Sequence, residues 1–230
     1  MEISVFGTGM VGRALAGRLA RLGHDVVVGT RNVEQTLART EPDAKRTLAY
    51  TQWQQANPEV RLLSFPDAAA HGEVVFNEVA GLQSLTVLQA AGVGNLAGKV
   101  LVDLVVPLDY SHGRPPRLAF ANEDSLGEQI QHAFPDARVI KTLNTMHVNV
   151  MIDPARVPGR HNVFLAGEDA RAKEIVKNLL GEFGWPAEVM VDLGGIKAAR
   201  TTEMYAPLLF ALMDVLGTSD VNISVVRGPE

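Results

Sequence analysis

A short glycine-rich segment near the N-terminus has the spacing of a phosphate-binding turn. It reads Gly7-Thr8-Gly9-Met10-Val11-Gly12 and fits the pattern G-x-G-x-x-G. In this pattern the first glycine allows a tight turn, the second lets the backbone approach a pyrophosphate, and the third lets a helix pack closely on a strand. The helix that follows offers free N–H groups and a partial positive charge to phosphate oxygens. The segment therefore predicts a dinucleotide site.

The residues after the next apolar run indicate which dinucleotide binds. They read Gly29-Thr30-Arg31-Asn32, whereas a site for NAD usually has a carboxylate about 20 residues beyond the glycines. Thr30 can donate a hydroxyl hydrogen bond to a 2′-phosphate, and the planar guanidinium of Arg31 can pair with it. We therefore expect NADP, although a solvated surface cation at Arg31 is the alternative. Lys45 and Arg46 could add positive charge to this site, but the sequence does not indicate where they lie.

A second polar cluster closes a later apolar run, Lys141-Thr142-Leu143-Asn144-Thr145-Met146-His147. Ligands of open α/β sheets lie outside the carboxyl ends of the strands, so this cluster should face the nicotinamide. Asn144 and Thr145 could bond an acceptor carbonyl, and His147 could supply a proton. A turn cap at Asn144 and a loop histidine at His147 are the simpler readings. Glu78 is either a ribose or substrate contact or an exposed charge at a strand end.

These residues need a framework of alternating strands and helices. Apolar runs predict strands at 3–6, 26–28, 61–64, 73–79, 99–106, 138–144, 162–166 and 188–193. Helical periodicity falls at 10–22, 82–91, 125–134, 169–183 and in a long final helix, and 109–117 reads as a loop. Strands that alternate with helices predict an α/β fold with a doubly wound, mostly parallel sheet of the Rossmann type.

Composition narrows the class of protein further. The chain has 230 residues, a net charge of −5 and no cysteine, so it lacks a basic field for nucleic acid and lacks thiolate chemistry. The histidines form no metal-binding pair, and no serine has the spacing of a nucleophile elbow, so we expect no metal site and no hydrolase. We expect no signal peptide before the first strand, and no apolar run is long enough for a bilayer. We expect a cytoplasmic protein without a membrane partner.

The motifs together resemble the NADPH-dependent F420 reductases, also called NADPH:deazaflavin oxidoreductases, and their bacterial relatives. The resemblance covers nearly the whole chain. Its residues are the glycine turn, Val28–Arg31, Pro107–Tyr110, Lys141–Met146, and the tail from Arg200-Thr201-Thr202-Glu203-Met204-Tyr205-Ala206-Pro207-Leu208 through Asn222. The cytosolic domains of membrane-bound ferric reductases have similar folds.

This resemblance implies a single domain over residues 1–230, similar to the N-terminal domain of 6-phosphogluconate dehydrogenase. A Rossmann core would span about 1–143, and an extension over about 144–230 would add strands and a terminal helix. The resemblance also implies hydride transfer between NADP(H) and coenzyme F420 or a flavin-like ring. The residues that would bind the coenzyme are Gly7, Thr8, Gly9, Met10, Val11, Gly12, Thr30, Arg31, Asn32, Val79 and Ala80.

Two other functions fit the same motifs. One is a reductase of a small carbonyl or imine, and the other is a non-catalytic module that senses NADP(H). The terminal helix bears an apolar stripe formed by Met204, Leu208, Leu212 and Val215. Because such a stripe must be covered by its own chain or by a partner, we expect a homodimer, with burial inside the monomer as the alternative.

Overall fold

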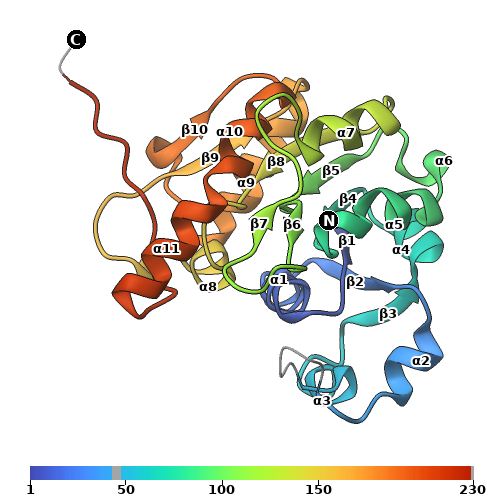
Figure 1. The fold of residues 1–230 in the computed structure, drawn as a ribbon. Coiled ribbons are helices and arrows are strands. Elements are labelled where there is room, and N and C mark those ends of the chain that lie inside the picture. The colour runs from blue at the N-terminus through green and yellow to red at the C-terminus, as the bar shows by residue number, and fades with distance from the viewer. Residues whose placement is uncertain (43–47, 229–230) are drawn as a thin grey trace.

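An eight-stranded sheet runs through the molecule, and a two-stranded sheet, described below, lies apart from it (Figure 1). The computed structural model describes residues 1–42 and 48–228. The strand order is β10-β9-β8-β5-β4-β1-β2-β3. The strands are β1 (Glu2–Phe6), β2 (Asp25–Thr30), β3 (Arg61–Ser64), β4 (Val74–Asn77), β5 (Val100–Asp103), β8 (Arg138–Thr142), β9 (Val163–Ala166) and β10 (Met190–Asp192).

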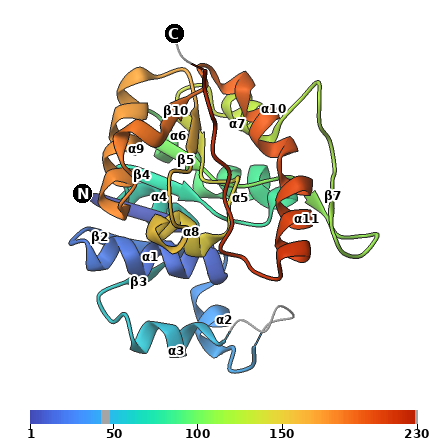
Figure 2. The same cartoon turned by 90° about the vertical axis from the view of Figure 1, so that its left-hand side faces the viewer.

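Helices connect these strands and cover both faces of the sheet (Figures 1 and 2). The α-helices are α1 (Met10–Arg21), α2 (Val33–Ala38), α3 (Tyr50–Gln55), α4 (Phe65–His71), α5 (Ser84–Ala91), α6 (Val93–Leu96), α7 (Leu126–Ala133), α8 (Val148–Ile152), α9 (Ala170–Phe183), α10 (Ala199–Met204) and α11 (Ala206–Leu216). Short 3-10 turns are η1 (Gly81–Gln83), η2 (Pro154–Arg156), η3 (Ala187–Val189) and η4 (Ile196–Ala198). This architecture confirms the predicted mostly parallel α/β fold.

Each face of the sheet carries its own apolar core. On one face, side chains of α1, α8 and α9 pack on alternate strand residues such as Ile3 and Val5. On the other face, α4, α5 and α7 pack on the intervening residues, such as Val75 and Val139. Burial on both faces explains why the strands read as continuous apolar runs rather than as alternating patterns.

Strand direction decides which loops meet. Six neighbouring strands of this sheet, β8, β5, β4, β1, β2 and β3, all run parallel. The segments after β1, β2, β4, β5 and β8 therefore share one edge of the sheet, here called the carboxyl edge. β9 runs antiparallel to β8 and therefore ends at the opposite edge, and β10 runs parallel to β9. The polar clusters found in the sequence thus lie along a common edge.

The structure refines two expectations about local elements. The predicted loop 109–117 is confirmed over residues 110–116, and it is the turn of a hairpin, because β6 (Leu108–Asp109) pairs antiparallel with β7 (Arg117–Leu118). The long final helix is divided at Tyr205 into α10 and α11. Pro207 stands in the first turn of α11, where a missing N–H costs no hydrogen bond. None of the helices in the described part of the chain has the length and apolar character needed to cross a membrane.

Candidate active site

The glycine turn joins β1 to α1, and two of its glycines are required by backbone contacts. Gly7 has a φ of +132°, and a Cβ added there would lie 2.4 Å from the carbonyl oxygen of Glu78. A Cβ on Gly12 would lie 2.2 Å from the carbonyl oxygen of Gly7, which holds α1 close to the strand. A Cβ on Gly9 would meet no atom within 4 Å among the described residues. Gly9 therefore faces open space, as the approach of a pyrophosphate requires.

The first turn of α1 presents its N–H groups at this open side. Gly9 is the N-cap residue, it provides no side-chain cap, and no acidic side chain stands in the first turn. Met10 is exposed and Val11 is half-buried. The carbonyl oxygen of Thr8 points back into the protein, where it accepts a 2.7 Å hydrogen bond from Nε of Arg13. Arg13 thus holds the turn on its protein side, and the backbone N–H groups of the first turn of α1 remain available to an anion.

At the end of β2, the hydroxyl of Thr30 already bonds within the protein, whereas Arg31 bonds none of the described residues. Oγ1 of Thr36 donates to the carbonyl oxygen of Asn32 at 2.8 Å, so in its 2.8 Å contact with Thr30 the hydroxyl of Thr30 is the donor. The side chain of Asn32 accepts from the backbone N–H of Gln35 and caps α2. Arg31 is exposed and pairs with none of the residues that the structure describes. Two further cations lie outside the described residues, Lys45 and Arg46.

The segment after β4 lies directly beside the glycine turn. Val79 is half-buried and Ala80 is exposed, and both follow Glu78, whose carbonyl oxygen faces Gly7. The segment continues into Gly81, where a Cβ would lie 2.1 Å from the carbonyl oxygen of Val106 after β5. Three neighbouring loops of the carboxyl edge are therefore in backbone contact.

A strained turn follows β8 at the same edge. Leu143 is buried, yet it has a φ of +62°, a left-handed conformation that is costly for a residue with a branched side chain. The N–H of Asn144 donates to the carbonyl oxygen of Thr142 at 2.8 Å. Asn144 is 5% exposed and Thr145 is 2% exposed. A strained residue persists only where the surrounding structure holds it, and such residues are found most often at active and ligand-binding sites.

Both polar side chains in this turn lack partners. Nδ2 and Oδ1 of Asn144 and Oγ1 of Thr145 have no hydrogen bond to any described residue. Buried polar groups are nearly always paired, since leaving one without a partner costs free energy. A bound ligand or an ordered water could therefore complete the hydrogen bonding of these three atoms. The turn lies next to α8, a helix packed against α1.

His147 stands at the end of the same turn in a different role. It is the N-cap of α8, and its Nδ1 accepts from the backbone N–H of Asn149 at 3.3 Å. Burial lowers the pKa of His147, an effect that Asp220 opposes and Arg156 reinforces. The neutral ring then carries its hydrogen on Nε2. His147 is thus a helix cap through Nδ1, and its role as a proton donor stays a prediction.

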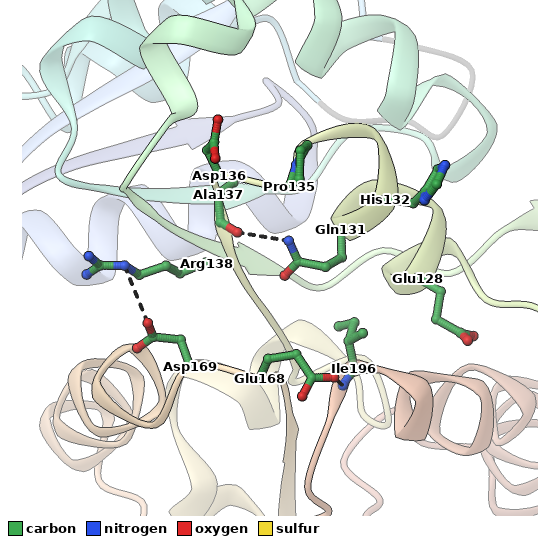
Figure 3. A pocket seen from close by; sticks show the side chains of 10 residues that line it. All are labelled: Glu128, Gln131, His132, Pro135, Asp136, Ala137, Arg138, Glu168, Asp169 and Ile196. Atoms are coloured by element: carbon green, nitrogen blue, oxygen red, sulfur yellow. Dashed lines mark hydrogen bonds and ion pairs between the residues drawn. The ribbon is translucent and has the colours of Figure 1, made fainter.

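Two other features lie at the edge opposite these loops. A cavity of about 690 Å³ is bounded by α7, the start of β8 and the turn after β9 (Figure 3). Its side chains include Arg138 and Asp169, which pair across 3.5 Å. Near the amino ends of β1 and β2, Glu2, Asp25 and His71 could surround a cation, but Arg61 already binds Asp25 at 3.1 Å. Neither feature adjoins the glycine turn.

The ion pairs of one buried residue were not predicted from the sequence. Lys141 in β8 is 1% exposed and forms ion pairs of 2.8 Å with both Asp103 and Glu203. Its charge was hidden in an apolar run, and its partners stand 38 and 62 residues away along the chain, a separation that short-range patterns cannot detect. The pairing of Lys141 with Asp103 could have been inferred from the sequence, because each stands in an apolar run that predicts a buried strand, and buried charges must be paired.

Comparison with known proteins gives the family. The family described as "NADP oxidoreductase coenzyme F420-dependent" matches residues 2–107. A solved structure from Arthrobacter sp. FB24, described as a putative F420-dependent NADP-reductase, is 49% identical, and the match covers 99% of this chain and 100% of that one with a TM-score of 0.93. The F420-dependent NADP reductase of Methanothermobacter marburgensis is 26% identical over the full length of both chains.

A third relative is much longer. Metalloreductase STEAP3 of Rattus norvegicus is 27% identical over 202 residues, which are 88% of this chain and 36% of the relative. The chain thus spans about a third of the length of that relative but all of the methanogen reductase. Identity, coverage and fold agree with the glycine turn and with the resemblance seen in the sequence. The chain belongs to the family of coenzyme F420-dependent NADP oxidoreductases and is an NADP-dependent oxidoreductase.

Proposed function

We propose that this protein transfers a hydride between NADP(H) and a deazaflavin of the coenzyme F420 type. The observation that carries the proposal is the pair of unpartnered buried side chains, Asn144 and Thr145, at the edge that also holds the glycine turn. A deazaflavin ring carries carbonyl and N–H groups that an amide and a hydroxyl can bond. The names of the Arthrobacter and Methanothermobacter relatives support this choice of acceptor.

The residues present fit the coenzyme at three places. Open space at Gly9 and the first turn of α1 would take the pyrophosphate, and Arg31 would pair with the 2′-phosphate. Val79 and Ala80 would line the nicotinamide side. When bound, the nicotinamide supplies the hydride, so the protein needs no nucleophile or metal of its own. Asn144 and Thr145 orient the acceptor, and the close-packed loops around them exclude water.

The decisive experiment offers NADPH together with one acceptor at a time and follows the loss of nicotinamide absorbance. The acceptors are coenzyme F420, FMN, FAD, a ferric chelate and a small cyclic imine. We expect rapid oxidation with the deazaflavin and slow oxidation with the others. Preference for the imine would support the carbonyl or imine reductase instead. Tight NADPH binding without oxidation by any acceptor would support the sensing module.

Replacing Asn144 with alanine should separate function from stability. Loss of one or two neutral hydrogen bonds to the acceptor is expected to lower turnover roughly 2- to 10-fold, with NADPH affinity nearly unchanged. Because the amide has no partner in the protein, its removal should leave the melting temperature unchanged or raise it. Steady-state kinetics, coenzyme titration and thermal unfolding measure the three quantities.

Asn57 offers the matched control for this substitution. It is also buried, but its Nδ2 donates to the carbonyl oxygen of Trp53 at 2.8 Å. Asn57→Ala should therefore lower the melting temperature and leave turnover intact. Equal loss of NADPH affinity and turnover in Asn144→Ala would show that Asn144 only shapes its loop.

We also propose that the protein is a homodimer that associates through α11. Three apolar side chains of α11 are exposed: Leu208 at 53%, Val215 at 83% and Leu216 at 59%. The helix contains only one charged residue, Asp214. Met204, the first residue of the expected stripe, ends α10 and is also exposed, and Leu212 is half-buried. Figure 2 shows α11 at the surface of the molecule. The monomer therefore leaves most of this apolar helix uncovered.

Light scattering at micromolar concentration should give twice the mass of one chain. The double substitution of Leu208→Glu and Val215→Glu should give a monomer, because each buried interface would then hold four uncompensated carboxylates. Val226→Glu changes an equally apolar side chain that is 90% exposed in the C-terminal tail, and it should leave the dimer intact. A monomeric parent protein would refute the proposal.

A further inference from the structure

A cluster of charged side chains lies inside the protein beneath the carboxyl edge. Nζ of Lys141 donates to Oδ2 of Asp103 at 2.8 Å and to the carbonyl oxygen of Val105, and it lies 2.8 Å from Oε1 of Glu203. These three contacts use all three hydrogens of the ammonium group. Lys141 is thus fixed in position by β5, by the segment after β5, and by α10.

The partners of Lys141 extend the cluster to the neighbouring loops. Oδ1 of Asp103 accepts from the backbone N–H of Val105 at 3.3 Å and from Nδ2 of Asn77 at 2.9 Å. Nδ2 of Asn77 also donates to Oγ of Ser84, the first residue of α5. The residues Asn77, Asp103 and Lys141 stand side by side in register on β4, β5 and β8. One polar row therefore holds the segments that follow three strands.

Glu203 joins this row to two helices. Its Oε2 accepts from the N–H of Leu126 at 2.9 Å, and its Oε1 accepts from the N–H of Gly127 at 3.0 Å, so the carboxylate caps the start of α7. Burial raises the pKa of Glu203, and Lys141 opposes that rise. All partners of its two oxygens are donors, so the geometry is that of a carboxylate. Burial would lower the pKa of Lys141, but Asp103 and then Glu203 outweigh burial, and the pKa is raised.

This arrangement is a poor way to stabilise a fold. Buried ion pairs pay a desolvation cost, and well-packed apolar side chains of similar volume often stabilise a protein as well or better. The remainder of this sheet face uses such side chains, among them Val75, Leu101 and Val139. The charges appear where the strands reach the carboxyl edge, three residues before Asn144. Their placement points to a role at that edge.

We propose that Lys141 is a positioning residue that fixes the segment after β5 and the turn after β8 around the nicotinamide end of the coenzyme. The inference rests on the proposed function. Val105 is held at both its N–H and its carbonyl oxygen, and the next carbonyl, that of Val106, packs against Gly81. Lys141 thus determines the separation between the loops after β4 and β5 and the turn that bears Asn144. The adenosine half of the coenzyme, at the glycine turn and Arg31, lies outside this cluster.

The test replaces the whole cluster, because removing Lys141 alone would leave two buried carboxylates without compensation. The variant combines Asp103→Asn, Lys141→Met and Glu203→Gln, which removes all three charges together. Two ligands are titrated by fluorescence or calorimetry: NADPH, and 2′,5′-ADP, which contains only the adenosine half. We expect about 10-fold weaker binding of NADPH and a change of less than about twofold for 2′,5′-ADP. We expect turnover about 10- to 100-fold lower, the loss that a displacement of about 1 Å can cause.

Lys173 and Asp192 supply the matched control. They form another partly buried ion pair, at 2.9 Å, between α9 and β10. The double substitution Lys173→Met with Asp192→Asn should leave both affinities and turnover unchanged. Asp103→Asn alone is the milder second variant if the triple variant does not fold. It keeps the shape of the side chain and should weaken NADPH binding more than 2′,5′-ADP binding.

The two ligands make the outcome decisive. A folded variant with parental affinity for both ligands and parental turnover would overturn the inference. Equal loss of both ligands would also overturn it, because the cluster would then only maintain the fold. The ratio of the two dissociation constants needs no acceptor. If no acceptor oxidises NADPH in the parent protein, the proposed function fails, whereas the ratio still tests the role of Lys141.

Discussion

The Arg31→Ser variant is expected to bind NADPH about 10- to 100-fold more weakly than the parent protein, with little change in the binding of NADH. A 2′-phosphate carries close to two negative charges near neutral pH, and a guanidinium can bond it through two parallel hydrogen bonds. A hydrogen bond to a charged group contributes about 1.5–3 kcal/mol. Arg31 is exposed and pairs with none of the described residues, so its donors are available.

The measurement is the ratio of kcat/KM with NADPH to kcat/KM with NADH, for the parent and for Arg31→Ser. The effect should shrink as salt rises, because mobile ions screen an exposed charge pair. Thr36→Val should have a small effect, since the hydroxyl of Thr36 already bonds within the protein, to Thr30 and to the carbonyl oxygen of Asn32. Arg171→Ser removes an exposed cation from α9 and serves as the control. A parent protein that prefers NADH, or a ratio that survives Arg31→Ser, would disprove the assignment.

Gly9→Ala should abolish most coenzyme binding without unfolding the protein. A Cβ at Gly9 meets nothing within 4 Å in the described structure, and the φ of −77° suits alanine. In the proposed site, the new methyl group would instead occupy the space through which the pyrophosphate approaches the backbone. A methyl group forced into a close contact costs about 1–3 kcal/mol, which corresponds to about 5- to 150-fold weaker binding. The melting temperature should fall only by the small amount expected from an altered N-cap.

Gly12→Ala gives the contrasting result at the third glycine of the same turn. Its Cβ would lie 2.2 Å from the backbone oxygen of Gly7, so the strand and α1 must move apart. We expect a clear loss of thermal stability together with the loss of NADPH binding. Equilibrium titration and thermal unfolding of both variants would separate the two roles. Normal NADPH affinity in Gly9→Ala would show that the pyrophosphate lies elsewhere.

The sequence predicts the framework well because the strongest signals are local. The unit from β1 to β2 combines apolar strands, a periodic helix and fixed glycine spacing, and all of these lie within about 30 residues. The short helix α4 (Phe65–His71) was not predicted, because it has too few residues to show periodicity. Its start was nevertheless readable, since Ser64 caps the N–H of Asp67 and Pro66 stands in the first turn.

The candidate site was predictable in place but less so in detail. The position of Asn144 and Thr145 follows from strand direction, and their lack of partners could be learned only from the packed structure. His147 has the same residue type whether it donates a proton or caps α8, and its cap contact was visible only in the structure. The partners of Lys141 come from β5 and α10, and their meeting depends on the three-dimensional arrangement of the sheet.

The reversal of β9 has a practical consequence for measuring these effects. Because β9 runs against β8, the turn after β9 lies at the edge of the sheet away from the glycine turn. The cavity drawn in Figure 3 lies beside that turn. Asp136 is an exposed residue at this cavity, and the protein contains no cysteine. Asp136→Cys would therefore introduce a single thiol. A fluorescent label on that thiol would provide one unique attachment point, at the edge of the sheet opposite the proposed coenzyme site.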